Sequence, residues 1–170
     1  MNAIGQAFLD QSRRYLSDQY LPKIAACVER LSAEDVWWRG NPASNSAGNL
    51  LLHLAGNMRQ WIISGVGGAP DQRQRQREFD ARDGDSAAEL LDRLGNTVRE
   101  ADAVLAAIAP EELLERRAIQ GHDVTVMEAI YHVVEHFSMH TGQIILLTKL
   151  RTGQDLEFYQ VVDGVTRRHW

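Results

Sequence analysis

Three histidines stand four residues apart in the C-terminal third of the chain: His132, His136 and His140. Side chains at positions i and i+4 of a helix lie one above the other, so two imidazoles at this spacing can bind one metal ion. All three cannot do so, because His132 and His140 would be about 12 Å apart along the helix. Metal–nitrogen bonds are only about 2 Å long. The spacing therefore predicts a divalent-metal site on His132 and His136 or on His136 and His140.

The apolar pattern around these histidines favours the second pair. Residues at alternating spacings of four and three form a seam along the predicted helix, and this seam is expected to face the helical core. It includes both His136 and His140, whereas His132 lies toward its edge. Imidazoles buried in an apolar seam need partners, and a metal ion supplies one. The other members of the seam are Ala129, Val133, Gln143, Leu147 and Leu150.

A third ligand must come from another helix, and His53 is the only histidine inside any other predicted helix. Asn57 follows one turn later on the same side. We find no cysteine or acidic residue obviously placed to complete the set, and Glu135 would lie on a different face from His136 and His140. A site with three histidines and an open position is typical of catalytic rather than structural zinc. The alternative interpretation of His53 is a core histidine with ordinary hydrogen-bond partners.

Four segments with helical periodicity must position these residues. The first runs from about Ala3 to Leu31 and is interrupted by Pro22, where it should kink or restart. The other three are bounded by N-cap residues and by glycine or proline. They start near Ser46, Ser86 and Thr125, and end near Gly65, Pro110 and Arg151. The pattern predicts an all-α protein, an antiparallel four-helix bundle.

The segments outside the helices are predicted to be irregular. Residues 71–85 are interpreted as a solvated loop or frayed helix end rather than an anion site, because the arginines from Arg73 to Arg77 alternate and do not share a helix face. Residues 120–123 should form a turn between two short strands. We expect residues 1–153 to form the bundle. Residues 154–170, which include His169, should form a tail that packs on the bundle or trails from it.

Composition limits the class of protein. A chain of 170 residues fits one domain, and its net charge of −5 does not favour nucleic acid as a partner. Cys27 is the only cysteine, which excludes an internal disulfide and fits a reducing compartment. We expect neither a signal peptide nor a membrane span, because no basic segment followed by an apolar one occurs near residue 1 and no apolar run is long enough to cross a membrane. We therefore expect a cytoplasmic protein with no membrane partner.

The sequence resembles the DinB-like family of metal-binding four-helix bundles, in a branch of unassigned function. The resemblance covers Leu9 to about Leu150. Relatives place a histidine in the second helix and a His-xxx-His pair in the fourth, just before Gly-Gln-Ile, which implies His53, His136 and His140 as ligands. Four stretches carry the resemblance: Tyr20-Leu21-Pro22-Lys23-Ile24; Trp37-Trp38 followed by Asn45-Ser46-Ala47-Gly48-Asn49-Leu50; Leu52-His53-Leu54-Ala55-Gly56-Asn57; and the segment from His132 to Ile144.

The resemblance also implies a mononuclear site, commonly zinc or nickel, and frequently a homodimer. Characterised relatives include thiol-dependent transferases and a thiol-dependent isomerase, and others are presumed hydrolases. We therefore expect a metal-dependent transferase or hydrolase that activates a low-molecular-weight thiol or water toward a small-molecule substrate. Asn57 and His132 would be catalytic, through orientation or proton relay, and Gln143 would contribute to cofactor binding. One alternative is a bundle in which the metal only links two helices and no reaction is catalysed. The other is a bundle without metal.

Overall fold

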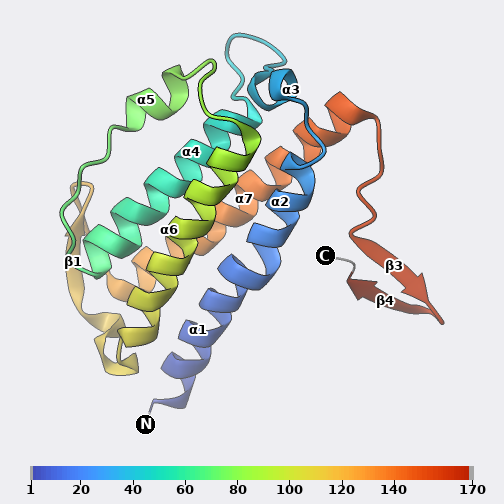
Figure 1. The fold of residues 1–170 in the computed structure, drawn as a ribbon. Helices are drawn as coiled ribbons and strands as arrows, with labels where there is room; N and C mark the ends of the chain where they lie inside the picture. The colour runs from blue at the N-terminus through green and yellow to red at the C-terminus, as the bar shows by residue number, and fades with distance from the viewer. Residues whose placement is uncertain (1, 169–170) are drawn as a thin grey trace.

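A computed structural model describes residues 2–168 as a bundle of four helical rods (Figure 1), which confirms the predicted all-α class. Short helices lie in the connections: α3 (Ala33–Trp37), α5 (Arg75–Asp80) and the 3-10 helix η3 (Pro110–Leu114). Within residues 2–168, no helix is both long enough and apolar enough to span a bilayer. The rods consist of α1 (Ala3–Arg14), the π-helix η1 (Tyr15–Tyr20) and α2 (Leu21–Val28); α4 (Ala47–Met58) and the π-helix η2 (Arg59–Val66); α6 (Ala87–Ala107); and α7 (Val126–Thr152).

The direction of the rods depends on one long connection. The first rod and α7 run one way, and α4 and α6 run the other way (Figure 1). The helices α4 and α6 are parallel neighbours because residues 67–86, which include α5, return along the length of the bundle before α6 begins. The pair that bears the histidines, α4 and α7, is antiparallel. This arrangement leaves α5 free to lie beside α4, where it contributes to the site described below.

The helix ends follow local signals in the sequence. Ser46, Ser86 and Thr125 each accept a backbone hydrogen bond at the start of α4, α6 and α7, as predicted. Pro22 lies in the first turn of α2, directly after η1, so the first rod continues through the proline but changes there from a π-helix to an α-helix. A proline is tolerated at this point because its missing N–H would have had no partner within the new helix.

The inward face of α7 begins on the predicted seam and then departs from it. Ala129 and Val133 are fully buried, but Gln143 is exposed and Leu150 is 63% exposed. The prediction was wrong for Gln143 and Leu150, because a strict 4-3 pattern drifts by about 20° per seven residues around a straight helix. Ile144 faces the core at this level of the helix instead.

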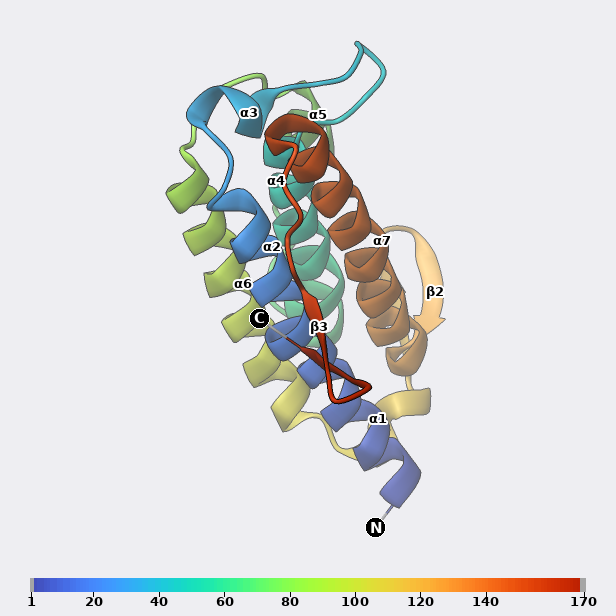
Figure 2. The same cartoon turned by 90° about the vertical axis from the view of Figure 1, so that its right-hand side faces the viewer.

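Two hairpins complete the described chain. β1 (Arg116–Ile119) pairs with β2 (His122–Thr125) just before α7, which confirms the predicted short strands, although His122 and Asp123, predicted to lie in the turn, belong to β2. Gln120 and Gly121 connect them with positive φ angles of 53° and 81°, as a type I′ turn requires. The tail forms a second hairpin of β3 (Tyr159–Val162) and β4 (Val165–Arg168), beside the first rod and α7 (Figure 2). His169, predicted as a tail residue, lies outside the described residues.

Candidate metal centre

Three histidine side chains meet between α4 and α7. His53 comes from the middle of α4, and His136 and His140 come from successive turns of α7. Their potential ligand atoms all lie within 4.8 Å of one another. The ring centroids are 4.8 Å apart for His53 and His136, 5.2 Å for His53 and His140, and 4.4 Å for His136 and His140. The structure therefore brings together the ligand set predicted from the sequence, within reach of one ion.

The environment of His136 fits a metal ligand. Its Nε2 atom is buried and has no hydrogen-bond partner among residues 2–168. A buried polar nitrogen without a partner is unfavourable, and coordination of a cation removes that penalty. Burial, reinforced by the neighbouring His140 and His53, lowers the pKa of His136 to about 3. The ring is therefore neutral at neutral pH, which is the form that binds metals.

His140 is oriented by a neighbour on its own helix. The side chain of His140 is buried, and its Nδ1 donates a hydrogen bond to Oε1 of Gln143 over 2.7 Å. The proton on Nδ1 leaves the lone pair on Nε2 available for a metal. Gln143, which the sequence placed at the cofactor, therefore lies against a predicted ligand, and it does so from the exposed surface of α7.

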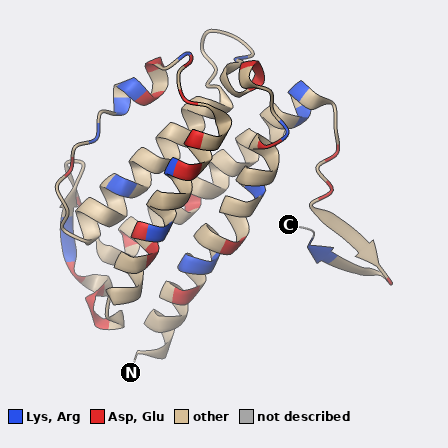
Figure 3. Ribbon diagram, viewed as in Figure 1, with Lys and Arg blue, Asp and Glu red and all other residues tan. Residues whose placement is uncertain are grey.

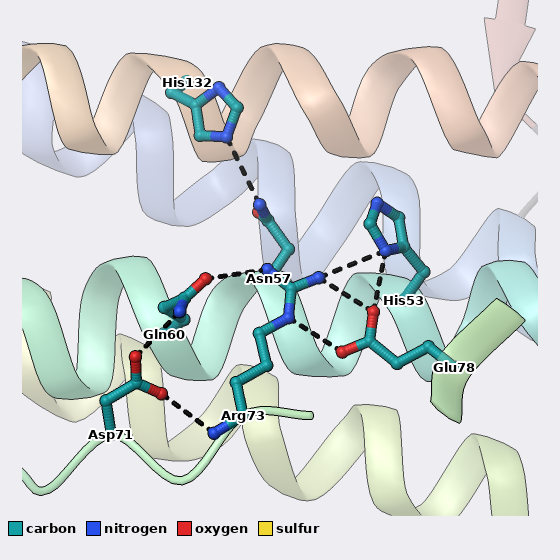
Figure 4. Close-up of polar contacts among 7 residues, drawn as sticks. All are labelled: His53, Asn57, Gln60, Asp71, Arg73, Glu78 and His132. Carbon is teal, nitrogen blue, oxygen red and sulfur yellow. Dashed lines mark hydrogen bonds and ion pairs between the residues drawn. The ribbon is translucent and has the colours of Figure 1, made fainter. Parts of the chain in front are cut away.

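His53 is oriented by a buried ion pair from the segment after η2 (Figure 4). Its Nδ1 lies 2.8 Å from Oε2 of Glu78, and Arg73 donates to both oxygens of the same carboxylate over 2.7 and 2.8 Å. Only 4% of the Arg73 side chain and 10% of the Glu78 side chain are exposed. Such a two-pronged contact is among the stronger ion pairs that side chains form.

Electrostatics fix the protonation of this group. Burial by itself would raise the pKa of Glu78, but hydrogen bonds from Arg73 and His53 outweigh it and hold the pKa below its usual value. The carboxylate is therefore charged and accepts the Nδ1 proton of His53, which frees Nε2 for a metal. Arg73 Nη2 also lies 3.1 Å from Nδ1 of His53, but it cannot donate to a nitrogen that already carries a proton.

The ion pair corrects the prediction for residues 71–85. Arg73 and Glu78 are buried against α4, so this part of the segment is not a solvated loop. A signal for the contact is present at Gly56, inside α4, where an added Cβ would collide with Oε1 of Glu78. Glycine in a helix interior often marks a close approach by another part of the chain. Neither Arg73 nor Glu78 was predicted to belong to the site, although Gly56 marked the contact in the sequence.

Asn49 fastens the segment to the start of α4. Its amide Nδ2 donates to the backbone carbonyl oxygens of Glu78 and Ala81 over 2.8 and 2.9 Å. Arg39 donates to Oδ1 of Asn49 and to the carbonyl of Phe79 over 2.6 and 2.8 Å. The ring of Phe79 then lies against the His53 ring, with centroids 4.7 Å apart. These contacts hold α5 over the histidines.

A second polar layer lies one helical turn away. The amide of Asn57 on α4 donates to Nε2 of His132 on α7 over 3.2 Å (Figure 4). The His132 ring contacts the Trp61 ring, with centroids 4.3 Å apart, and lies 5.4 Å from the ring of His136. Burial lowers the pKa of His132, which favours the neutral ring that accepts this bond. The predicted catalytic residues Asn57 and His132 thus lie beside the three histidines.

Asn57 has unused hydrogen-bonding capacity. The residue is 3% exposed, and its Oδ1 atom has no partner within the part of the chain that the structure describes. Most buried side-chain oxygens accept at least one hydrogen bond. This oxygen is therefore available to a donor group on a bound molecule.

A cavity of about 550 Å³ opens between α4, α6 and residues 72–85. Arg73 and Glu78 form part of its wall, whereas His53, His136 and His140 are not among its lining residues. The cavity and the metal centre therefore share the ion pair that orients His53.

Comparison with known proteins finds a family model that matches nearly the whole chain. Residues 3–164 match the model of a family described as a protein of unknown function (DUF1572). No curated protein gives a significant match. The fold is similar to that of a conserved protein from Enterococcus faecalis, with 17% identity and a TM-score of 0.70 over 85% of this chain and 97% of that one. A DinB-like protein from Bacillus cereus has 17% identity and a TM-score of 0.67 over 87% of this chain and 93% of that one.

Proposed function

Because this chain belongs to the family described as a protein of unknown function (DUF1572) and its fold is similar to that of a DinB-like protein, we propose that it is a metal-dependent enzyme acting on a small molecule. His53, His136 and His140 would hold one divalent ion, zinc or nickel. The observation that carries the proposal is the buried Nε2 of His136. It lies without a hydrogen-bond partner within residues 2–168, between two histidines whose Nδ1 protons are already held by Glu78 and Gln143.

The proposed reaction is transfer of a low-molecular-weight thiol to an electrophile, or hydrolysis. A divalent ion supplies Lewis acidity that lowers the pKa of a thiol or a water molecule toward neutrality. Oδ1 of Asn57 would accept a hydrogen bond from the substrate. His132 would accept a proton at Nε2 once that atom is released from its hydrogen bond with the Asn57 amide. His132 suits this role because its ring is held neutral beside the site.

The competing function is a structural metal site, which links two helices of the bundle and catalyses no reaction. Ligands from two helices, α4 and α7, support it. Structural zinc sites are usually closed by a fourth protein ligand, whereas catalytic sites keep an open position. Within residues 2–168, the cluster that can bind a metal contains three histidines, and Glu78 bonds Nδ1 of His53 rather than joining them. A set of three histidine ligands with an open position favours an enzyme over a structural metal site.

The first experiment measures metal content in protein purified without a histidine tag. We expect about one divalent ion per chain in the wild type and a substoichiometric amount in His136→Ala. His122→Ala is the matched control, because His122 is exposed on β2. A wild type without metal, or equal metal content in the two histidine variants, would contradict the proposed metal centre.

The second experiment distinguishes a catalytic metal site from a structural one. The metal-loaded wild type is assayed against thiol and electrophile pairs and against ester and amide panels. Activity that disappears in His136→Ala supports the enzyme. Two results together would support a structural metal site. The first is full metal occupancy with no turnover in either panel, and the second is a large loss of thermal stability on metal removal.

A further inference from the structure

The cavity beside α5, which we call the arginine cavity, has four arginine side chains in its wall. Its volume of about 550 Å³ lies within the range of roughly 300–1,000 Å³ that is usual for small-molecule sites. The four side chains come from three parts of the chain that meet around this space (Figure 3): they are Arg59 at the start of η2, Arg73 and Arg77 in the segment around α5, and Arg93 on α6. So many cations around one space indicate a site for a negatively charged group.

The structure changes the interpretation of the arginine-rich segment. Its arginines alternate along the sequence, and the prediction of a solvated loop rested on the absence of a shared helix face. In the structure Arg73 and Arg77 both line the cavity, whereas the Arg75 guanidinium lies over the Phe79 ring, 4.8 Å from its centroid. Two of the three arginines therefore face one space, and this requires no common helix face.

Among the four arginines of the wall, Arg77 lacks a counter-charge from the described chain. The other three form ion pairs, in which the acidic partners of Arg59, Arg73 and Arg93 are Glu100, Glu78 and Asp85. Arg77 is exposed and has no side-chain hydrogen bond or ion pair within residues 2–168. All of its guanidinium N–H donors are therefore available, and a guanidinium can bind a planar carboxylate through two parallel hydrogen bonds.

The charge of the wall favours a monoanion. The lining contains four arginines and three acidic residues, which gives it a net charge of +1. The acidic residues are Glu78, Asp83 and Asp85. Asp83 is exposed, and its carboxylate would repel a second negative charge on the ligand. A carboxylate therefore suits this wall better than a phosphate dianion.

The wall also includes apolar surface. Trp37, Leu52 and Ala55 line the cavity, and the first two are only partly buried. The indole N–H of Trp37 donates to the backbone carbonyl of Asp85 over 3.2 Å, which fixes the ring against the segment. Sites for small molecules combine apolar walls with a few polar groups that orient the ligand. This wall therefore fits a ligand with a charged end and an apolar body.

The polar side of the cavity is held in place by the chain itself. The backbone oxygens of Glu78 and Ala81 accept hydrogen bonds from Asn49. Further along the segment, Asp85 is held by its ion pair with Arg93, over 2.7 Å. A wall that is already ordered loses little conformational entropy when a ligand binds. The cavity thus has the preorganisation that a binding site needs.

We propose that the arginine cavity binds a small organic monocarboxylate with an apolar body. Arg77 would hold the carboxylate, and Trp37 and Leu52 would cover the body. The site is separate from the metal centre, because none of the three metal-binding histidines is among its lining residues. The proposal therefore does not depend on the proposed metal-dependent reaction.

The first test compares two probes of similar shape. Benzoate and benzamide differ in charge, and their binding to the full chain is measured by isothermal titration calorimetry. We expect benzoate to bind at least about tenfold more tightly than benzamide, and Arg77→Gln to weaken benzoate binding about tenfold or more. Arg75→Gln is the matched control, because it removes the same charge from the same helix outside the cavity. Absence of benzoate binding, equal affinity of the wild type for the two probes, or equal benzoate affinity in the two variants would overturn the proposal.

The second test locates the probe. Carboxylates also bind metal ions, so benzoate is titrated into both the wild type and His136→Ala while NMR records the indole N–H signals. We expect the Trp37 signal, assigned with Trp37→Phe, to shift with a similar midpoint in both proteins, and the signal of Trp61, which lies beside His132, to stay in place. Binding that disappears in His136→Ala would place benzoate on the metal and overturn the cavity site. A shift of the Trp61 signal without one of Trp37 would overturn it in the same way.

Discussion

Nδ1 of His53 donates its hydrogen bond to Glu78, on the short helix α5, over 2.8 Å. The carboxylate is held from its other side by Arg73, so the imidazole ring is oriented by a group that is itself fixed. Partners of this kind set the ring orientation and the protonation of metal-binding histidines.

Glu78→Gln should therefore weaken metal binding while the fold persists. Glutamine keeps the size of the side chain but removes the charge that stabilises the Nδ1 proton of His53. We expect metal affinity to fall by about 10–100-fold, measured by competition with a chromogenic chelator. Asp80→Asn is the control, because Asp80 is exposed on the same helix. Equal affinity in the two variants would show that Glu78 does not act on the site.

Gly56→Ala tests the close approach of α5 to α4. Alanine normally stabilises a helix interior by about 1 kcal/mol relative to glycine. At this position the new Cβ would collide with Glu78, so we expect a net loss of about 1–3 kcal/mol in the free energy of unfolding. Gly95→Ala in α6 is the control, because its Cβ would make only an ordinary 3.5 Å contact with Arg99. A stabilised Gly56→Ala variant would contradict the packing described here.

The metal-free protein should lose stability in mild acid. The pKa of His136 is about 3 in the folded chain and about 6.5 in an unfolded one, so below about pH 6.5 the unfolded chain binds a proton that the folded chain does not. The free energy of unfolding should then fall by up to about 1.4 kcal/mol per pH unit for this group between about pH 6.5 and pH 3. Urea titrations at about pH 7.5 and pH 5 measure the effect. His136→Gln should show a smaller pH dependence than the wild type, and an equal pH dependence would contradict the role given to His136.

His132→Phe should separate turnover from metal binding. The substitution removes a proton acceptor beside the site but keeps a ring against Trp61. We expect full metal content and a kcat about 10²–10³-fold lower, with the corresponding limb missing from the pH–rate profile. Tyr131→Phe, on the exposed side of the same helix, should match the wild type in both. An unchanged kcat in His132→Phe would remove His132 from the mechanism.

The sequence predicted the parts of the site that depend on local geometry. The spacing of His136 and His140 on one helix follows directly from its period, and the position of His53 within an apolar stretch indicated the partner helix. Glu78 was not predictable in this way, because its contact with His53 joins residues 25 positions apart through tertiary packing. Gly56 was the local trace of that contact.

The tail shows a different limit. Asp163 and Gly164, with φ angles of 53° and 75°, form a two-residue hairpin turn between valine-containing strands. This dipeptide is among the clearest hairpin signals in a sequence, so the turn was predictable, although residues 154–170 were expected only to form a tail. The β3–β4 hairpin leaves the bundle directly after Leu156 and Phe158, which are buried in the core, and only the folded chain reveals this.

The long connection between η2 and α6 also bears on how the protein folds. Asn57 and His132 are 75 positions apart, so the polar layer beside the histidines assembles only when distant parts of the chain have met. Contacts of such long range form late, because the entropy of closing the loop must be met before they contribute. Metal capture should therefore follow assembly of the helices.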